Sequence, residues 1–349
     1  MIEPNIALTQ DLVKLVAQID EFKGRWEALK NLSPDRLNAL RKVATVESVG
    51  SSTRIEGAKL TDFQVETLLS NIKMQKFDTR DEQEVAGYAE AMDLIFQAFE
   101  NMPITENHIR QLHQVLLRHS TKDERHRGDY KKLDNHVVAI DQNGKEIGII
   151  FETATPFETP RLMEELVHWA KKAIDEESMH PLLIVAVFIV QFLAIHPFQD
   201  GNGRLSRVLT TLMLLRAGYA YVPYASLESV IEENKDIYYK SLRRTQTTLK
   251  SNDPDWTPWI GFFLRCLKKQ KDNLVKRLDG EQELVDDREL PEISVQILKL
   301  FDIHDRLNLS KIVELTGGNK NTIKVRLREL VNAGQISKHG KARATWYVK

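Results

Sequence analysis

Twelve consecutive residues, HPFQDGNGRLSR at His196–Arg207, combine a turn and side chains suited to binding phosphate. The stretch lies between an apolar helical segment and a second helical pattern. A glycine-rich turn that leads into a helix presents unpaired backbone N–H groups and the positive end of the helix dipole, and both attract phosphate. Gly201 and Gly203 leave the backbone open to close approach, and Asn202 adds side-chain donors. We therefore expect an anion-binding turn here.

The charged side chains of the same stretch suit phosphoryl or nucleotidyl transfer. Arg204 and Arg207 are three residues apart, so they share a face of the first helical turns and can fork onto phosphate oxygens. Asp200 is a hard oxygen ligand suited to Mg²⁺, which usually takes one or two carboxylates plus substrate phosphates. His196 can accept a proton near neutral pH and so activate a hydroxyl. Each feature alone is more often structural, but their joint occurrence predicts a transfer site, and the spacing is not that of a P-loop.

The elements that must hold this stretch are predicted to be mostly helices. Leu182–Ile195, directly before it, is an apolar run of 14 residues. A membrane span needs about 20, so this run is expected to be a buried core helix. An earlier helix is predicted from Ser33, as N-cap with a proline after it, to Gly57 at its C-terminal end. One β-hairpin is expected at Val137–Thr153, where two β-branched strands flank an Asn-Gly turn at 143–144.

Composition sets the class of protein. The chain has 349 residues, 42% hydrophobic and 28% charged, with a formal net charge of −1, and this length favours two or three domains. Its single cysteine, Cys266, excludes an internal disulfide framework and fits a reducing compartment. The N-terminus lacks the basic start and apolar core of a signal peptide. We expect a soluble, cytoplasmic protein without membrane contact.

The near-neutral total conceals a basic C-terminal region. Pro291–Lys349 carries 11 Lys and Arg against 5 Asp and Glu, a local charge of +6. Three short helical patterns are followed there by a basic, two-stranded ending, an order typical of a winged helix-turn-helix domain. We predict an N-terminal helical segment at 1–78, a catalytic domain at 79–280 and a winged helix at 290–349. The winged helix is expected to contact DNA or protein, with a plain solvated face as the alternative.

The stretch at His196–Arg207 also resembles a known family. It matches every fixed position of the Fic motif, H-P-F-x-[DE]-G-N-G-R-x-x-R. The segment RGDYKKL and the hairpin after it resemble the family's flap region, although Lys131 stands where arginine is common, and NKDIYYKSL resembles its adenine-side helix. The resemblance covers about Met1 to Leu278. It implies a mainly α-helical Fic-type domain with a β-hairpin flap, which moves AMP from ATP to a protein hydroxyl and releases pyrophosphate.

The resemblance also implies roles for individual residues. His196 would be the general base on a Ser, Thr or Tyr hydroxyl, Asp200 would hold Mg²⁺, and Phe198 would anchor the loop in the core. Tyr238 would contact the adenosine. The nucleotide would further be bound by the turn and the helix after it, through Gly201, Asn202, Gly203, Arg204, Leu205, Ser206 and Arg207.

A shorter motif lies upstream, in SSTRIEG at Ser51–Gly57. A carboxylate at a helix C-terminus faces the negative end of the dipole at a small cost, so Glu56 is either solvated or paired with a distant cation. Ser52, Glu56 and Gly57 fit [ST]-x-x-x-E-[GN], which resembles the family's inhibitory helix motif. There the glutamate pairs with the second arginine of the Fic motif, here Arg207. The resemblance thus implies an enzyme autoinhibited by Glu56, with Ser52 assisting.

Two other functions stay open. A DNA-binding regulator could use the Fic-type domain as a nucleotide sensor, although an intact base and magnesium ligand would be superfluous in a sensor. The same site could also remove AMP from a modified target, with Glu56 positioning water. The sequence identifies neither the target protein nor its acceptor residue, and it leaves self-modification and a homodimer open.

Overall fold

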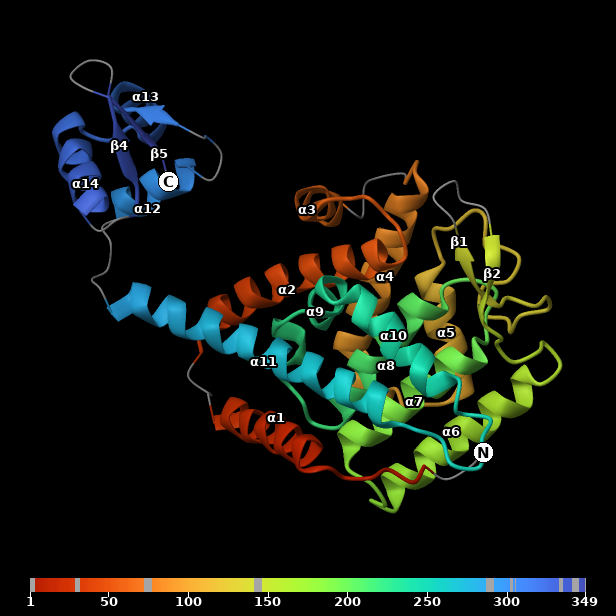
Figure 1. Cartoon of the computed structure of the whole chain (residues 1–349). Helices are drawn as coiled ribbons and strands as arrows, with labels where there is room; N and C mark the ends of the chain where they lie inside the picture. The colour runs from red at the N-terminus through yellow and green to blue at the C-terminus, as the bar shows by residue number, and fades with distance from the viewer. Residues whose placement is uncertain are drawn as a thin grey trace. The chain divides into compact units, whose positions relative to one another are not determined.

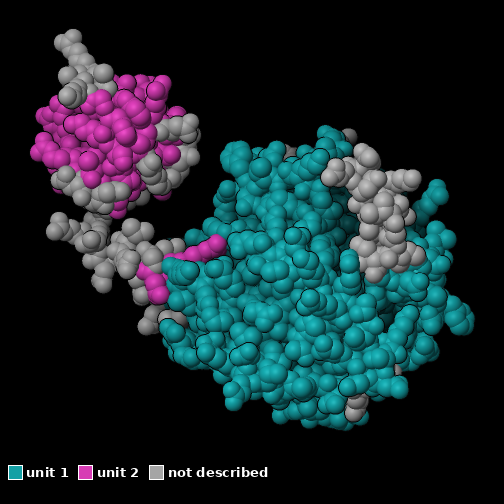
Figure 2. Space-filling view, in the orientation of Figure 1, with its two compact units in different colours: residues 1–276 teal, residues 277–349 magenta. Residues whose placement is uncertain are grey.

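The computed structural model describes residues 4–28, 32–71, 77–140, 146–286, 292–301, 304, 306–332, 335–340 and 345–348. The chain forms two compact units, residues 1–276 and 277–349 (Figure 1, Figure 2). Helices predominate, as predicted, and the described strands form one hairpin and one three-stranded sheet. Among these residues, none of the helices is both long enough and apolar enough to span a membrane.

The first unit contains the predicted transfer site and the hairpin. Its elements, in chain order, are α1 (Gln10–Ala28), α2 (Pro34–Ile55), α3 (Asp62–Ser70), α4 (Arg80–Ala98), η1 (Phe99–Asn101), α5 (Glu106–Leu116), β1 (Val137–Ile140), β2 (Glu146–Phe151), α6 (Thr159–Asp175), α7 (Pro181–Ile195), α8 (Asn202–Arg216), η2 (Val222–Tyr224), α9 (Leu227–Glu233), α10 (Lys235–Gln246) and the first part of α11 (Thr257–Asp286), which continues past residue 276.

Helix α7 lies at the centre of the first unit (Figure 1). Of its 15 residues 12 are buried, because its side chains are apolar on every side and such a helix needs neighbours all round. Helices α6, α8 and α10 pack against it. The indole of Trp259, on α11, donates a hydrogen bond of 2.7 Å to the Ala186 carbonyl of α7. The predicted buried core helix is confirmed.

Helix α2 carries the SSTRIEG motif. It starts where predicted, since the Ser33 hydroxyl accepts a hydrogen bond of 3.2 Å from the Arg36 N–H and Pro34 takes the first helical position. It ends at Ile55, and Gly57 after it has a φ of +108°, a left-handed conformation that favours glycine. Because α2 packs against α4, α8 and α9, its C-terminal turn lies inside the unit that holds the transfer site.

The predicted hairpin is present as strand β1 paired antiparallel with β2. Val138 pairs with Ile149 and Ala139 with Gly148, with a register shift on either side. Strand β2 lies against α10, which attaches the hairpin to the helical unit. The Asn-Gly turn predicted at 143–144 lies outside the described residues.

Beyond α11, the described residues of the second unit form three helices and a small antiparallel sheet with the strand order β3-β5-β4. Helices followed by a hairpin agree with the order read from the sequence, and the assignment as a winged helix stays a prediction. Its core consists of Ile297, Phe301, Leu307, Ile312, Ile323, Leu327, Leu330 and Ile336. Its elements are α12 (Glu292–Phe301), β3 (Leu307–Asn308), α13 (Leu309–Thr316), α14 (Lys320–Asn332), β4 (Ser337–His339) and β5 (Trp346–Val348).

Candidate active site

The turn between α7 and α8 puts His196 at the end of one helix and Gly201 at the start of the next. His196 has a φ of +54°, a left-handed conformation that is uncommon for a residue with a side chain and recurs at functional sites. Gly201 has a φ of +81° and offers no side chain to cap α8. The first N–H groups of α8 therefore have no acceptor within the helix, and an anion is stabilised at this end.

The imidazole of His196 is neutral and can accept a proton at Nε2. Its Nδ1 lies 3.3 Å from the Leu193 carbonyl, which can only accept a hydrogen bond, so the ring proton is on Nδ1. Burial, together with the positive charge of Lys131, lowers the pKa of His196 to about 4. At neutral pH the Nε2 lone pair is therefore available to a base-catalysed step.

The loop before α8 is held by hydrogen bonds to its backbone. Asn202 accepts from the Phe198 N–H at 2.9 Å and donates to the Phe198 carbonyl at 2.6 Å. Asn135 donates to the same carbonyl at 2.6 Å, and Lys131 donates to the Asn135 side-chain oxygen at 2.7 Å. The sequence predicts side-chain donors for phosphate at Asn202, but the structure commits that amide to the loop. One side-chain N–H of Asn202 is thus used within the loop, whereas its backbone N–H at the start of α8 has no acceptor within the helix.

His113, on α5, supports the loop from another side. It is fully buried and stacks on Phe198 with 3.8 Å between ring centroids. Its Nδ1 accepts from the Gly128 N–H at 2.8 Å, so the proton is on Nε2, which donates to the Asp200 carbonyl at 3.0 Å. Burial lowers the pKa of His113 to about 4, which keeps the ring neutral. The roles of His113 and Asn135 could not be predicted from the sequence, because only folding brings these residues to the motif.

Asp200 and Arg204 pair with each other and with two residues of α4. Arg204 Nη2 lies 3.3 Å from Asp200 Oδ1, and its Nη1 lies 3.3 Å from Glu84 Oε2. Arg80 Nη2 lies 3.6 Å from the other Asp200 oxygen. Burial alone would raise the pKa of Asp200, but Arg204 and the Gly201 N–H bring it below its usual value. The Asp200 carboxylate is therefore ionised at neutral pH.

Asp200 is also the residue that fits a magnesium ion. Its side chain is 28% exposed, and an ionised carboxylate is a hard oxygen donor. Mg²⁺ often takes one or two carboxylates and receives its other ligands from water and substrate phosphates. A single carboxylate beside a phosphate-binding turn fits this pattern. Within the described ranges, no group of three or more His, Cys, Asp or Glu side chains forms a metal centre by itself.

The two sequence motifs meet at Arg207. Its Nη2 lies 2.8 Å from Glu56 Oε1, its Nε donates to the Ser52 hydroxyl at 2.8 Å, and Nη2 also donates to the Ser52 carbonyl at 2.9 Å. The guanidinium is thus shared between Ser52 and Glu56, and it does not bind both oxygens of the carboxylate. Burial alone would raise the pKa of Glu56, but Arg207 brings it below its usual value.

The Glu56 carboxylate also covers the start of α8. A Cβ atom built on Gly203 would lie 2.1 Å from Glu56 Oε1, so only glycine at this position leaves room for the carboxylate. The N-terminal end of a helix favours a negative charge. Glu56 therefore lies against the turn at which the sequence predicts phosphate binding.

The remaining predicted nucleotide-binding residues are buried in α8 and α10. Leu205 and Ser206 are 0% and 1% exposed. Tyr238 is 4% exposed, and its hydroxyl contacts Arg207, whereas its neighbour Tyr239 is 40% exposed. Adjacent helix residues point to different sides, so the sequence could not decide which of the two tyrosines reaches solvent.

Residues 103–214, which include the α7–α8 turn, match the Fic/DOC family. The protein adenylyltransferase Fic of Drosophila grimshawi is 27% identical over 270 residues, which are 77% of this chain and 50% of that protein. The protein adenylyltransferase Fic of Drosophila mojavensis is 27% identical over 271 residues, which are 76% of this chain and 49% of that protein. The chain therefore spans about half the length of the curated relatives it matches.

Solved structures share the fold. A Fic family protein from Desulfovibrio desulfuricans G20 gives a TM-score of 0.64 at 23% identity, covering 99% of this chain and 98% of that chain. A Fic domain containing signaling protein from Bacteroides thetaiotaomicron VPI-5482 gives a TM-score of 0.61 at 24% identity, covering 78% of this chain and 97% of that chain. Identities at this level show a common fold.

Proposed function

We propose that this chain, whose residues 103–214 match the Fic/DOC family, is a protein adenylyltransferase, which moves AMP from ATP to a Ser, Thr or Tyr hydroxyl of a target protein. The observation that carries the proposal is the neutral imidazole of His196 beside the uncapped N-terminus of α8. A base next to a preorganised anion site is what nucleotidyl transfer requires. The relatives named protein adenylyltransferase Fic support the same activity.

In the proposed reaction, His196 Nε2 accepts the proton of the target hydroxyl. The hydroxyl oxygen bonds to the α-phosphorus of ATP, the bond to the β-phosphate oxygen breaks, and pyrophosphate leaves. The backbone N–H groups at the start of α8 and the guanidinium groups of Arg204 and Arg207 would hold the phosphates. Asp200 would hold Mg²⁺, which when bound neutralises phosphate charge.

We further propose that Glu56 restrains this activity. Its carboxylate contacts Arg207 at 2.8 Å and lies against Gly203, so it competes with phosphate for the same cation and the same helix end. With Glu56 in this position, the terminal phosphates of ATP would lack their arginine and the nucleotide would bind in a non-productive pose.

One labelling experiment tests the proposed activity. Wild type and Glu56→Gly would be incubated in a cell lysate with ATP labelled on the α-phosphate. We expect the Glu56→Gly variant to label one or more proteins, itself included, and identification of these would name the target. ATP labelled only on the γ-phosphate should transfer no label. Transfer of the γ label would indicate a kinase, and transfer of neither label would refute the proposal.

The hairpin is proposed to position the target. In a two-stranded sheet each strand has one edge without a partner in that sheet, and an extended peptide can pair with such an edge through main-chain hydrogen bonds. Proline at position 149 would remove one main-chain donor. We expect Ile149→Pro to lower target modification by about 2- to 10-fold, the value of one hydrogen bond, and to change ATP affinity less. Ile149→Ala, which keeps the N–H, is the control, and equal losses in both measurements would make the hairpin structural only.

A second proposed function is DNA contact by the second unit. Lys320, Lys324 and Arg328 are exposed along α14, whereas Ile323 and Leu327 of the same helix are buried in the core. The apolar side of α14 is thus fixed against the unit and the basic side faces solvent. A helix with this arrangement suits the phosphates of a DNA groove.

The salt dependence of binding tests this contact. The logarithm of DNA affinity should fall with the logarithm of salt concentration, with a slope of about −0.9 for each phosphate contacted. Lys324→Ala should make this slope less steep by about 0.9, the contribution of one phosphate contact. Lys299→Ala, which changes an exposed lysine on α12, should not alter it. If a mobility-shift assay detected no binding of the protein to any DNA at low salt, the second unit would be a protein-docking module.

A further inference from the structure

Arg207 would keep two of its partners if Glu56 moved away. Both belong to Ser52, whose hydroxyl and carbonyl accept from the guanidinium at 2.8 and 2.9 Å. The carbonyl is available because the last turn of α2 tightens, and the Glu56 N–H bonds to the Thr53 carbonyl at 3.1 Å. Carbonyls at a helix C-terminus need outside donors. Arg207 therefore caps α2 at the negative end of its dipole.

The Ser52 hydroxyl is in turn held by a buried relay. The Tyr88 hydroxyl lies beside the Ser52 hydroxyl and donates to Glu228 Oε1 at 2.8 Å. Arg207 Nε donates to the Ser52 hydroxyl, so the guanidinium, the two hydroxyl groups and the Glu228 carboxylate form one buried polar cluster. Ser52 on α2 and Tyr88 on α4 are 0% exposed, and Glu228 on α9 is 2% exposed.

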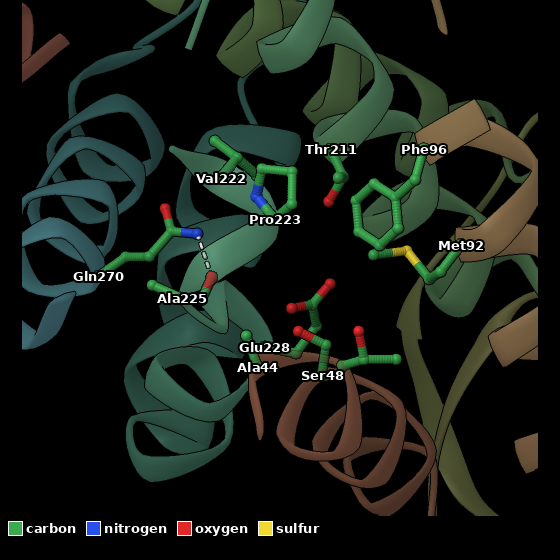
Figure 3. Close-up of a pocket in the computed structure, with 11 residues that line it drawn as sticks. Ala44, Ser48, Met92, Phe96, Thr211, Val222, Pro223, Ala225, Glu228 and Gln270 are labelled. Carbon is green, nitrogen blue, oxygen red and sulfur yellow. Dashed lines mark hydrogen bonds between the residues drawn. The ribbon is translucent and has the colours of Figure 1, made fainter. Parts of the chain in front are cut away.

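Figure 3 shows the Glu228 end of the relay. Glu228 and Ser48 line a cavity of about 10 Å³, which has room for no more than one water molecule. In the described part of the chain no Lys, Arg or His forms an ion pair with Glu228, and the Ser226 hydroxyl lies 3.4 Å from its second oxygen. Buried charges are stable only when they are compensated. The cation of this cluster is Arg207, which donates to the Ser52 hydroxyl beside Tyr88.

We propose that Ser52, Tyr88 and Glu228 position Arg207 for the nucleotide phosphates, so that α2 supports the active state as well as inhibiting it. The inference rests on the proposed function and deepens it. The Glu56 side chain is 33% exposed and is the part that leaves. Ser52 is fully buried and stays in place. The motif resemblance implies that Ser52 assists inhibition. In the proposed arrangement Ser52 instead supports the active enzyme.

The test uses the Glu56→Gly chain, in which the inhibitory carboxylate is absent. Adding Ser52→Ala should weaken ATP binding about 10- to 100-fold, because a buried guanidinium loses a hydrogen-bond partner. Adding Tyr88→Phe should weaken it about 3- to 10-fold, since the relay loses one neutral link. AMP lacks the phosphates that Arg207 would hold, so its affinity should change by less than about 2-fold. Calorimetric titration with ATP and with AMP measures both.

Tyr219→Phe in the same background is the matched control. The Tyr219 hydroxyl donates to Asp20 at 2.7 Å and the residue is 1% exposed, so this change removes a similar tyrosine–carboxylate bond away from the site. It should leave ATP affinity unchanged. The inference is wrong if Ser52→Ala strengthens ATP binding, if ATP and AMP binding weaken equally, or if Tyr88→Phe and Tyr219→Phe act alike. Failure of every variant to transfer AMP would refute the proposed function, whereas the ATP-to-AMP comparison would still decide this inference.

Discussion

His196→Ala is expected to lower AMP transfer by about 10²- to 10⁴-fold, the usual loss when a general base is removed. The Leu193 carbonyl keeps the ring proton on Nδ1, and the low pKa of His196 leaves Nε2 unprotonated at neutral pH. ATP binding should persist, because the proposed phosphate contacts lie on α8. Transfer and ATP affinity would be measured side by side in the Glu56→Gly background, where activity is highest.

The pKa of His196 also sets the pH dependence of the step. A histidine with a pKa of about 4 is charged below that pH and neutral above it, so transfer should fall as the pH drops through 4. From about pH 5 to 8 the charge of His196 should not limit the rate. Undiminished transfer by His196→Ala would show that another group takes the proton. Equal losses of transfer and ATP affinity would make His196 a structural residue.

The transfer site could be predicted from the sequence because its parts are contiguous. The turn, the uncapped helix start and the two arginines follow from the local order of residues in His196–Arg207, and local order also fixes where α7 and α8 begin and end. The supports of that site come from distant parts of the chain. A buried tyrosine such as Tyr88 has the same helical spacing whether it only packs or also hydrogen-bonds, so its link to Glu228 is visible only in the fold.

Two details of the site show the same limit. The sequence predicts phosphate donors at Asn202, because an amide in a turn is free to donate, but the Phe198 backbone uses both ends of that amide. A two-atom pair is the usual geometry between arginine and a carboxylate. Here the Arg207 Nε is taken by Ser52, and Glu56 receives one donor. Both differences arise from competition among neighbouring partners, which spacing along the chain does not reveal.

Glu56→Gly is expected to raise AMP transfer, self-modification included, by about 30- to 1000-fold. The carboxylate pairs with Arg207, which is 3% exposed, and a buried ion pair is costly to break because the remaining charge is left uncompensated. If the pair favours the inhibited arrangement by about 2–4 kcal/mol, it lowers activity by about 30- to 1000-fold, because about 1.4 kcal/mol corresponds to a tenfold change in an equilibrium. Transfer of α-labelled phosphate, compared with wild type at equal protein concentration, measures the change.

Two further variants separate the charge of Glu56 from its bulk. Glu56→Gln keeps the size of the side chain and removes its charge, so it should release part of the inhibition. Glu56→Gly combined with Arg207→Ala should stay inactive, because the released site would lack the cation that holds the phosphate tail. If the double variant were as active as Glu56→Gly, Arg207 would not be the group that Glu56 withholds from ATP.

Lowering the pH should not activate wild type in the way that Glu56→Gly does. The pKa of Glu56 lies below its usual value in the inhibited arrangement, so the carboxylate stays ionised and paired from pH 5 to 8, and wild type should gain no activity over that range. Release therefore requires that something displace the Glu56 side chain, which is possible because it is 33% exposed while Arg207 beneath it is buried. If the Glu56→Gly variant transferred AMP no faster than wild type, Glu56 would have no inhibitory role, and its contact with Arg207 would be structural only.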